Sequence, residues 1–185
     1  MDEFIKLLKP SIDLKNINDI RSVSTLINVA SPRILLSTLQ IQDRIYFIRE
    51  GVIRRYSIVD GEENTNWFFS KGDFAISEDS FFLDEASEEY LETTGPSLLI
   101  EIKKADYLNL INNSPEFKQL VNRLYKKYIS GKREYQRVIT NPRINSYDWF
   151  ATNHKYALNH IKLHHLARFL GITKEYLSKL RSQNR

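Results

Sequence analysis

Near Lys104 the spacing of apolar residues changes, and this change limits the folds open to the chain. Before it, short runs rich in Ile, Val, Tyr, Phe and Thr alternate with turn sequences such as Glu50-Gly51 and Asp60-Gly61. After it, apolar residues recur at intervals of three and four. The first pattern is typical of β-strands and hairpins, and the second of amphipathic helices. The sequence therefore predicts an α+β fold with a β-rich N-terminal part.

The strands expected before Lys104 are short and closely spaced, which favours a jelly roll (a double-stranded β-helix), a sandwich or a small barrel. They are residues 34–40, 44–49, 52–59, 64–69, 89–94 and 98–102. At the N-terminus, residues 2–9 predict a short amphipathic helix that ends at Pro10. Residues 18–30 fit either a helix or an irregular lead-in.

A long helix is expected after a short one at residues 105–112. Ser114 can cap it, and Pro115 suits its first position. If the helix runs to about Ile139, it is roughly 39 Å long at 1.5 Å per residue. Gly131 interrupts its middle.

One side of this helix carries an apolar stripe that exceeds what a small β domain can cover, so we expect the helix to pair with a second copy in a homodimer. The alternative is that the stripe packs on the chain's own domains. The residues expected at the dimer interface are Phe117, Leu120, Val121, Leu124, Tyr128 and Tyr135.

The C-terminal residues 162–181 have the spacing of a helix-turn-helix, after a helix at residues 143–152 and a loop at 153–161. Ala167 is small where two helices cross, Gly171 stands where the turn needs positive φ, and Thr173 can cap the next helix. The alternative is an ordinary helical hairpin in a core.

The second helix of this motif would expose polar side chains that can reach a DNA major groove. The expected base contacts are Lys174, Glu175, Ser178 and Lys179. The expected phosphate contacts are Lys162, His164, Thr173, Tyr176, Arg181 and Arg185.

Charge is distributed unevenly along the chain. Up to residue 112 there are 12 Lys and Arg against 19 Asp and Glu, and after it 15 against 4. A basic half joined to an acidic half suggests that only the C-terminal half meets a polyanion such as double-stranded DNA. Surplus lysine on long helices is the alternative.

Several other classes of protein are not expected. The chain has no cysteine, which excludes disulfides and thiolate metal sites and fits a reducing cytoplasm. All four histidines lie at 154–165, outside the expected strands, so neither a metal site nor a metal-dependent enzyme on the β domain is expected. Walker and nucleophile-elbow motifs are missing, and no apolar run approaches a membrane span or signal peptide. We therefore expect a cytoplasmic protein that is neither an enzyme nor membrane-bound.

Four stretches together resemble the Crp/Fnr family of bacterial transcription regulators, and most of all its compact Bacteroidetes members. They are residues 46–54, 67–74, 114–139 and 166–181. The resemblance implies a cyclic-nucleotide-binding-like β-roll sensor domain at 1–113, a dimerisation helix at 114–140 and a helix-turn-helix DNA-binding domain at 141–185. It also implies a homodimer that binds an inverted repeat. In the family, the positions matching Lys174, Glu175 and Lys179 contact base edges.

The loop at residues 75–90 departs from the family pattern. Nucleotide-binding members hold a Gly-Glu pair for the ribose there and an Arg-Ser pair for the cyclic phosphate. Here Ser87 or Glu88 stands where the arginine is expected, and no Lys or Arg lies between Lys71 and Lys103. Because a phosphate needs a positive or amide-rich cradle, neither cAMP nor another cofactor is expected.

The candidate effector pocket is Ser77, Glu78, Ser87 and Glu88, with no effector named. An alternative function is a ligand sensor on the same fold that acts through protein partners. The acidic stretch 78–92 leaves room for one, such as RNA polymerase.

Overall fold

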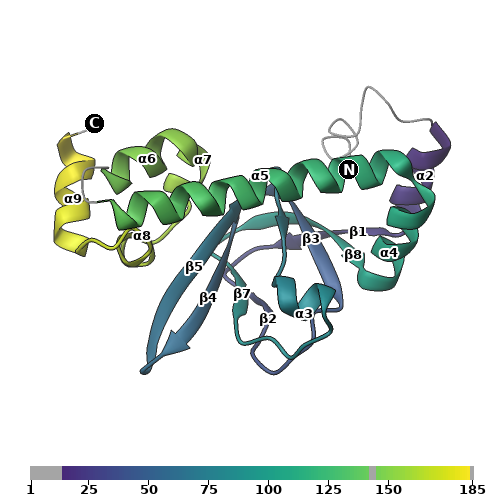
Figure 1. The fold of residues 1–185 in the computed structure, drawn as a ribbon, viewed down its shortest axis with the longest axis horizontal. Coiled ribbons are helices and arrows are strands. Elements are labelled where there is room, and N and C mark those ends of the chain that lie inside the picture. The colour runs from purple at the N-terminus through teal and green to yellow at the C-terminus, as the bar shows by residue number, and fades with distance from the viewer. Residues whose placement is uncertain (1–13, 142–144, 184–185) are drawn as a thin grey trace.

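The computed structural model describes residues 14–141 and 145–183 (Figure 1). The fold is α+β, as the sequence predicts: a β-roll, a long helix α5 (Pro115–Thr140) and a group of C-terminal helices. In Figure 1, α5 runs along the top of the roll toward the C-terminal helices at one end of the molecule. The helix expected at residues 2–9 lies outside the described residues.

Two four-stranded antiparallel sheets form the roll, and the chain passes repeatedly from one to the other. The first sheet contains, in spatial order, β1 (Ser24–Val29), β8 (Ser97–Lys103), β3 (Arg44–Glu50) and β6 (Phe74–Ala75). The second contains β2 (Ile34–Leu36), β7 (Tyr90–Thr93), β4 (Val52–Val59) and β5 (Glu62–Ser70). Asp60 and Gly61 join β4 to β5 with positive φ at both residues, as a tight hairpin turn requires.

The structure corrects the expected elements in three places. Residues 18–30 divide between helix α2 (Leu14–Ser22) and strand β1. The strand expected at 34–40 stops at Leu36, because the amide of Gln40 donates to the carbonyl of Ser37 in a turn. Strand β6 and helix α3 (Glu78–Phe82) were not expected, since each is too short to show a period.

Two clusters of buried side chains hold the molecule together. One packs α4 (Lys104–Asn113) and the start of α5 on the first sheet, and includes Phe47, Ile100 and Phe117. The other fills the roll and continues into the C-terminal helices. There the ring of Phe68 on β5 lies 5.1 Å, centroid to centroid, from the ring of Phe169. The C-terminal helices therefore share a core with the roll.

Helix α5 begins as the sequence predicts. The hydroxyl of Ser114 accepts a hydrogen bond from the amide of Phe117 at 3.2 Å, and Pro115 occupies the first turn. A glycine suits position 131 for a local reason, because a Cβ there would lie 3.3 Å from the Trp67 ring. The missing side chain lets α5 approach β5 closely.

The apolar stripe of α5 packs on the chain itself, which removes Phe117 and Leu120 from the expected dimer interface and leaves its other four residues partly exposed. Phe117 and Leu120 are fully buried in the first cluster, so neither is accessible to a second copy. Val121 and Leu124 pack on the same cluster, and Tyr128 and Tyr135 pack on the other. The apolar side chains that α5 leaves exposed are Tyr125, Ile129 and Ile139.

Four helices form the C-terminal part: α6 (Ser146–Asn153), α7 (Lys155–Leu158), α8 (Leu163–Phe169) and α9 (Lys174–Gln183). The loop expected at 153–161 thus contains the short helix α7. Asn145 caps α6 by accepting from the amides of Tyr147 and Asp148. Of the helices described here, none is long and apolar enough to cross a membrane.

Candidate functional site

Helices α8 and α9 form the helix-turn-helix that the sequence predicts. Gly171 in the turn has φ +67°, a conformation that glycine adopts without steric cost. The hydroxyl of Thr173 accepts from the amide of Tyr176 at 3.1 Å and so caps α9. Leu177 is fully buried and Ala167 nearly so, which fixes the face of α9 that packs on α8.

The opposite face of α9 is open to solvent at the end of the molecule (Figure 1). All four side chains expected to read bases are exposed there: Lys174, Glu175, Ser178 and Lys179. Among the expected phosphate contacts, the exposed ones are Lys162, His164, Thr173 and Tyr176. The motif therefore presents a mixed polar face with two lysines, as a major-groove reader requires.

Arg181 does not fit its expected role. Its Nη2 donates to the carbonyl of Leu158 at 2.6 Å and so ties the end of α9 to α7. This bond directs the guanidinium toward the chain instead of toward a phosphate, which corrects the prediction for that residue. Arg185 lies outside the described residues.

A buried arginine, Arg54 on β4, joins the helix-turn-helix to the roll. Its Nη1 lies 2.7 Å from Nδ1 of His165 on α8 and donates to Glu63 at 2.7 Å. Its Nη2 donates to Glu92 at 2.7 Å, and its guanidinium carbon lies 3.9 Å above the Tyr56 ring. Burial, and after it Arg54, lowers the pKa of His165 to about 4. The imidazole is therefore neutral at neutral pH and can accept from the guanidinium.

Further polar contacts hold the C-terminal helices on the roll. Arg168 on α8 donates to the carbonyl of Glu63 at 2.9 Å and pairs with the Glu62 carboxylate. The Tyr156 hydroxyl accepts from the amide of Gly51 at 2.7 Å, and Thr94 donates to the carbonyl of His160. Because these contacts come from β4, β5 and β7 and the loops beside them, the orientation of the helix-turn-helix depends on the roll.

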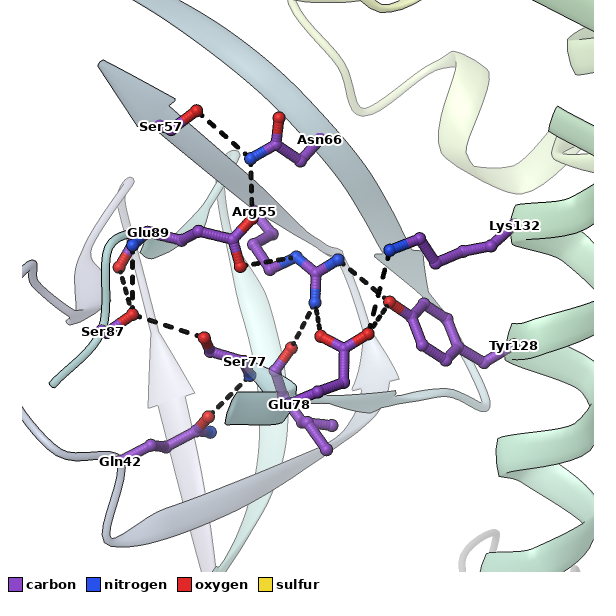
Figure 2. A network of polar contacts seen from close by, with 11 residues as sticks. Gln42, Arg55, Ser57, Asn66, Ser77, Glu78, Ser87, Glu89, Tyr128 and Lys132 are labelled. Atoms are coloured by element: carbon purple, nitrogen blue, oxygen red, sulfur yellow. Dashed lines mark hydrogen bonds and ion pairs between the residues drawn. The ribbon is translucent and has the colours of Figure 1, made fainter. Parts of the chain in front are cut away.

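The next residue, Arg55, points to the opposite side of β4, into the roll (Figure 2). Its Nη1 donates to the carbonyl of Ile76 at 3.2 Å and pairs with the Glu78 carboxylate. Its Nε lies 3.2 Å from Oε2 of Glu89. Two carboxylates thus surround one buried guanidinium, so its charge is compensated within the chain.

Helix α5 takes part in the same network (Figure 2). The hydroxyl of Tyr128 accepts from Nη2 of Arg55 at 2.9 Å and donates to Glu78. Lys132 lies 3.9 Å from the same carboxylate. Burial raises the pKa of the Tyr128 phenol, and the positive charge of Arg55 opposes that rise. The interior of the roll is thereby tied to the middle of α5.

Three of the four residues expected in an effector pocket lie in this network. The hydroxyls of Ser77 and Ser87 are 3.3 Å apart, and both side chains are buried near Glu78. Glu88 is exposed instead, and its neighbour Glu89 points inward. The prediction was wrong for Glu88 by one residue, because adjacent residues of an extended chain face opposite ways.

Sequence reasoning missed the positive charge of this site. The prediction considered only the loop between Lys71 and Lys103. The positive charge comes instead from Arg55 on β4 and Lys132 on α5. A signal was present, since two consecutive arginines interrupt an otherwise apolar strand. Buried arginines need partners, and adjacent strand residues point to opposite faces. That rule predicts two separate ion-pair sites.

The geometry defines a class of protein: a β-roll with an enclosed polar interior, coupled through one long helix to an exposed helix-turn-helix. Residues 28–114 match the family model of the cyclic nucleotide-binding domain. Among the described residues, no cluster of His, Asp and Glu is arranged to hold a metal ion. No curated protein matches the sequence.

Solved structures extend the likeness to most of the chain. CLP, the c-di-GMP-responsive global regulator of Xanthomonas campestris, is 16% identical with a TM-score of 0.65, and 93% of each chain is covered. FixK2 from Bradyrhizobium japonicum is 13% identical with a TM-score of 0.69, covering 87% of this chain and 84% of that one. A protein described as a Crp/Fnr-family regulator from Eubacterium rectale is 15% identical with a TM-score of 0.67, covering 91% and 81%. The chain therefore has the fold of full-length Crp/Fnr regulators.

Proposed function

We propose that the chain is a non-enzymatic transcriptional regulator of the Crp/Fnr type, which works in the cytoplasm and binds duplex DNA as a homodimer. Residues 141–185 would bind DNA, residues 114–140 would hold the dimer, and residues 1–113 would be the sensor. The carrying observation is the exposed face of α9, with Lys174, Glu175, Ser178 and Lys179 open to solvent above the buried Leu177.

The homodimer would use a different flank of α5 from the one that the stripe suggested. Tyr125, Ile129 and Ile139 are exposed, and at 100° per residue they fall within about 80° of one another. Pairing two such flanks would bury them and place two α9 helices on the same side of the dimer. The two α9 helices would then enter successive major grooves, about 34 Å apart, and contact the two halves of an inverted repeat.

The interior of the roll argues against cAMP as the effector. Glu78 and Glu89 already neutralise Arg55, so a cyclic phosphate entering this site would meet two carboxylates. The residues Ser77, Glu78, Ser87 and Glu89 form a closed polar network with α5 in place of an anion cradle.

The test is selection of duplexes from a randomised DNA library, followed by gel retardation of the winning sequence. Changing both Lys174→Ala and Lys179→Ala should weaken binding by at least about tenfold and relax the sequence preference, because each base contact contributes roughly 1–3 kcal/mol. The matched control is Lys103→Ala with Lys118→Ala, two exposed lysines far from α9 in the sequence.

Two outcomes would contradict the proposal. If the α9 variant keeps the wild-type sequence preference, the four residues are not the base readers. If the wild-type chain selects no duplex at all, the alternative of a sensor that acts through protein partners such as RNA polymerase would replace the regulator.

A further inference from the structure

A cavity of about 340 Å³ lies between the roll and α5 and reaches α6. Its volume is within the range of small-molecule sites. Aromatic rings from β5, α3, α5 and α6 provide much of its wall: Trp67, Phe69, Phe82, Tyr125, Tyr128 and Trp149. Of these six, Tyr128 hydrogen-bonds Arg55 and the Phe69 ring lies 5.8 Å from its guanidinium carbon, whereas no such contact joins the other four to Arg55.

The charged groups of the wall are compensated within the chain. Nζ of Lys127 lies 2.7 Å from Oδ1 of Asp73, and Glu134 lies 3.9 Å from Arg137. Burial lowers the pKa of His154, so this imidazole is neutral at neutral pH. An ion entering the cavity would lose its hydration without gaining an unpaired counter-charge from these groups, which favours a neutral occupant.

Trp149 is 8% exposed and lines the cavity, but its Nε1 is buried out of reach of an occupant. The wall therefore offers aromatic rings, against which the ring of a bound molecule would pack. We propose that this cavity binds a neutral aromatic small molecule.

The position of the cavity gives such a molecule a way to act on the helix-turn-helix. Trp149 and His154 belong to α6 and its C-cap, and their rings lie 5.2 Å apart. Trp67 joins this wall to α8, since its ring centroid lies 6.1 Å from that of Phe169. Occupancy would therefore alter the packing of roll, α5 and C-terminal helices at once. This regulatory step rests on the proposed function, whereas binding does not.

The probe is 6-propionyl-2-dimethylaminonaphthalene, a neutral aromatic ketone whose emission shifts to the blue in apolar surroundings. Excited directly and titrated with the full chain, it should bind saturably at one probe per chain. Val121 lines the cavity, and Val121→Phe should fill it and weaken binding at least about tenfold. Ile58→Phe, at an exposed position on β4, is the matched control and should leave binding unchanged.

The charged comparison is 8-anilinonaphthalene-1-sulfonate, which should bind more weakly than the neutral ketone. Should it bind more tightly, the inference of a neutral occupant fails.

Absence of saturable binding to the wild-type chain, or equal binding by Val121→Phe, would overturn the proposal. If circular dichroism shows that Val121→Phe does not fold, Leu124→Phe fills the same cavity. Gel retardation with and without the ketone then tests regulation, and an unchanged DNA affinity would overturn that step. A chain that binds no DNA would fail the proposed function, while the titration would still decide the cavity.

Discussion

Arg54 and Arg55 are neighbours on β4, both almost fully buried, yet they serve opposite sides of the sheet. Arg54 pairs with partly exposed carboxylates and with the helix-turn-helix through His165. Arg55 pairs with carboxylates inside the roll and with α5 through Tyr128. One strand thus contacts the helix-turn-helix on one face and the polar interior of the roll on the other. The environment of the partners, more than the burial of the arginine, should decide how much each site stabilises.

The largest effect should follow loss of Arg55. Arg55→Met should lower the free energy of unfolding by about 3–5 kcal/mol, because it leaves Glu89 without this cation and Glu78 with only Lys132, at 3.9 Å, inside the roll. Adding Glu78→Gln should recover part of the loss. Denaturant unfolding measures both, and Arg44→Met is the control, since Arg44 and its partner Glu101 form a more exposed pair. If Arg55→Met lowers the free energy of unfolding no more than Arg44→Met does, the prediction that Arg55 has the largest effect is contradicted.

A smaller loss is expected on the other face. Glu63 is 44% exposed, whereas Glu92, Glu78 and Glu89 are each only 23–24% exposed, so Glu63 can recover water when Arg54 is replaced. Arg54→Met should therefore cost about 2 kcal/mol in unfolding free energy. It should also raise the pKa of His165, since Arg54 is one cause of the lowered value. Denaturant unfolding and NMR titration of the imidazole check the two parts.

If Arg54→Met lowers the free energy of unfolding more than Arg55→Met does, the predicted difference between the two faces of β4 is reversed. The contact with the helix-turn-helix would then be the more stabilising of the two sites. An unchanged pKa of His165 in Arg54→Met would show that the guanidinium does not face the imidazole in solution.

These contrasts also show which features a sequence can reveal. The stripe on α5 showed that an amphipathic helix was present, because the spacing of Phe117, Leu120 and Tyr128 is local information. It did not show what covers the stripe, which depends on the depth of the roll and on the docking of α8. Ser77, Glu78 and Ser87 were found from the position of their loop in the family, although the loop's sequence departs from the family pattern. Arg55 was missed because its partners lie 21 to 73 residues away.

The helix-turn-helix was the most predictable part for the same reason. Gly171, Thr173 and Leu177 act within one short segment, so their spacing alone fixes the local geometry. Arg181 was assigned wrongly because its acceptor, the carbonyl of Leu158, belongs to a helix that the sequence did not reveal.

The smallest expected effect sharpens the comparison through pH. His165 has a pKa of about 4 in the folded chain, below the ordinary value of 6.5, so the unfolded chain binds a proton that the folded chain does not. The contribution of His165 to the free energy of unfolding is therefore complete above its pKa in the unfolded chain. It falls as the pH drops toward the pKa of His165 in the folded chain. Between about pH 7 and pH 5.5 the loss should be about 1 kcal/mol.

The measurement is denaturant unfolding across that range, compared with His165→Gln, which keeps a polar group but cannot titrate. Because the pKa values of His154 and His164 are also lowered, mainly by burial, the wild-type slope contains three contributions. Only the difference between wild type and variant reports on His165 itself, whose pKa is lowered first by burial and then by Arg54. Equal slopes for wild type and His165→Gln would mean that the α8 face of β4 is hydrated in solution, so that the two faces differ less than the structure indicates.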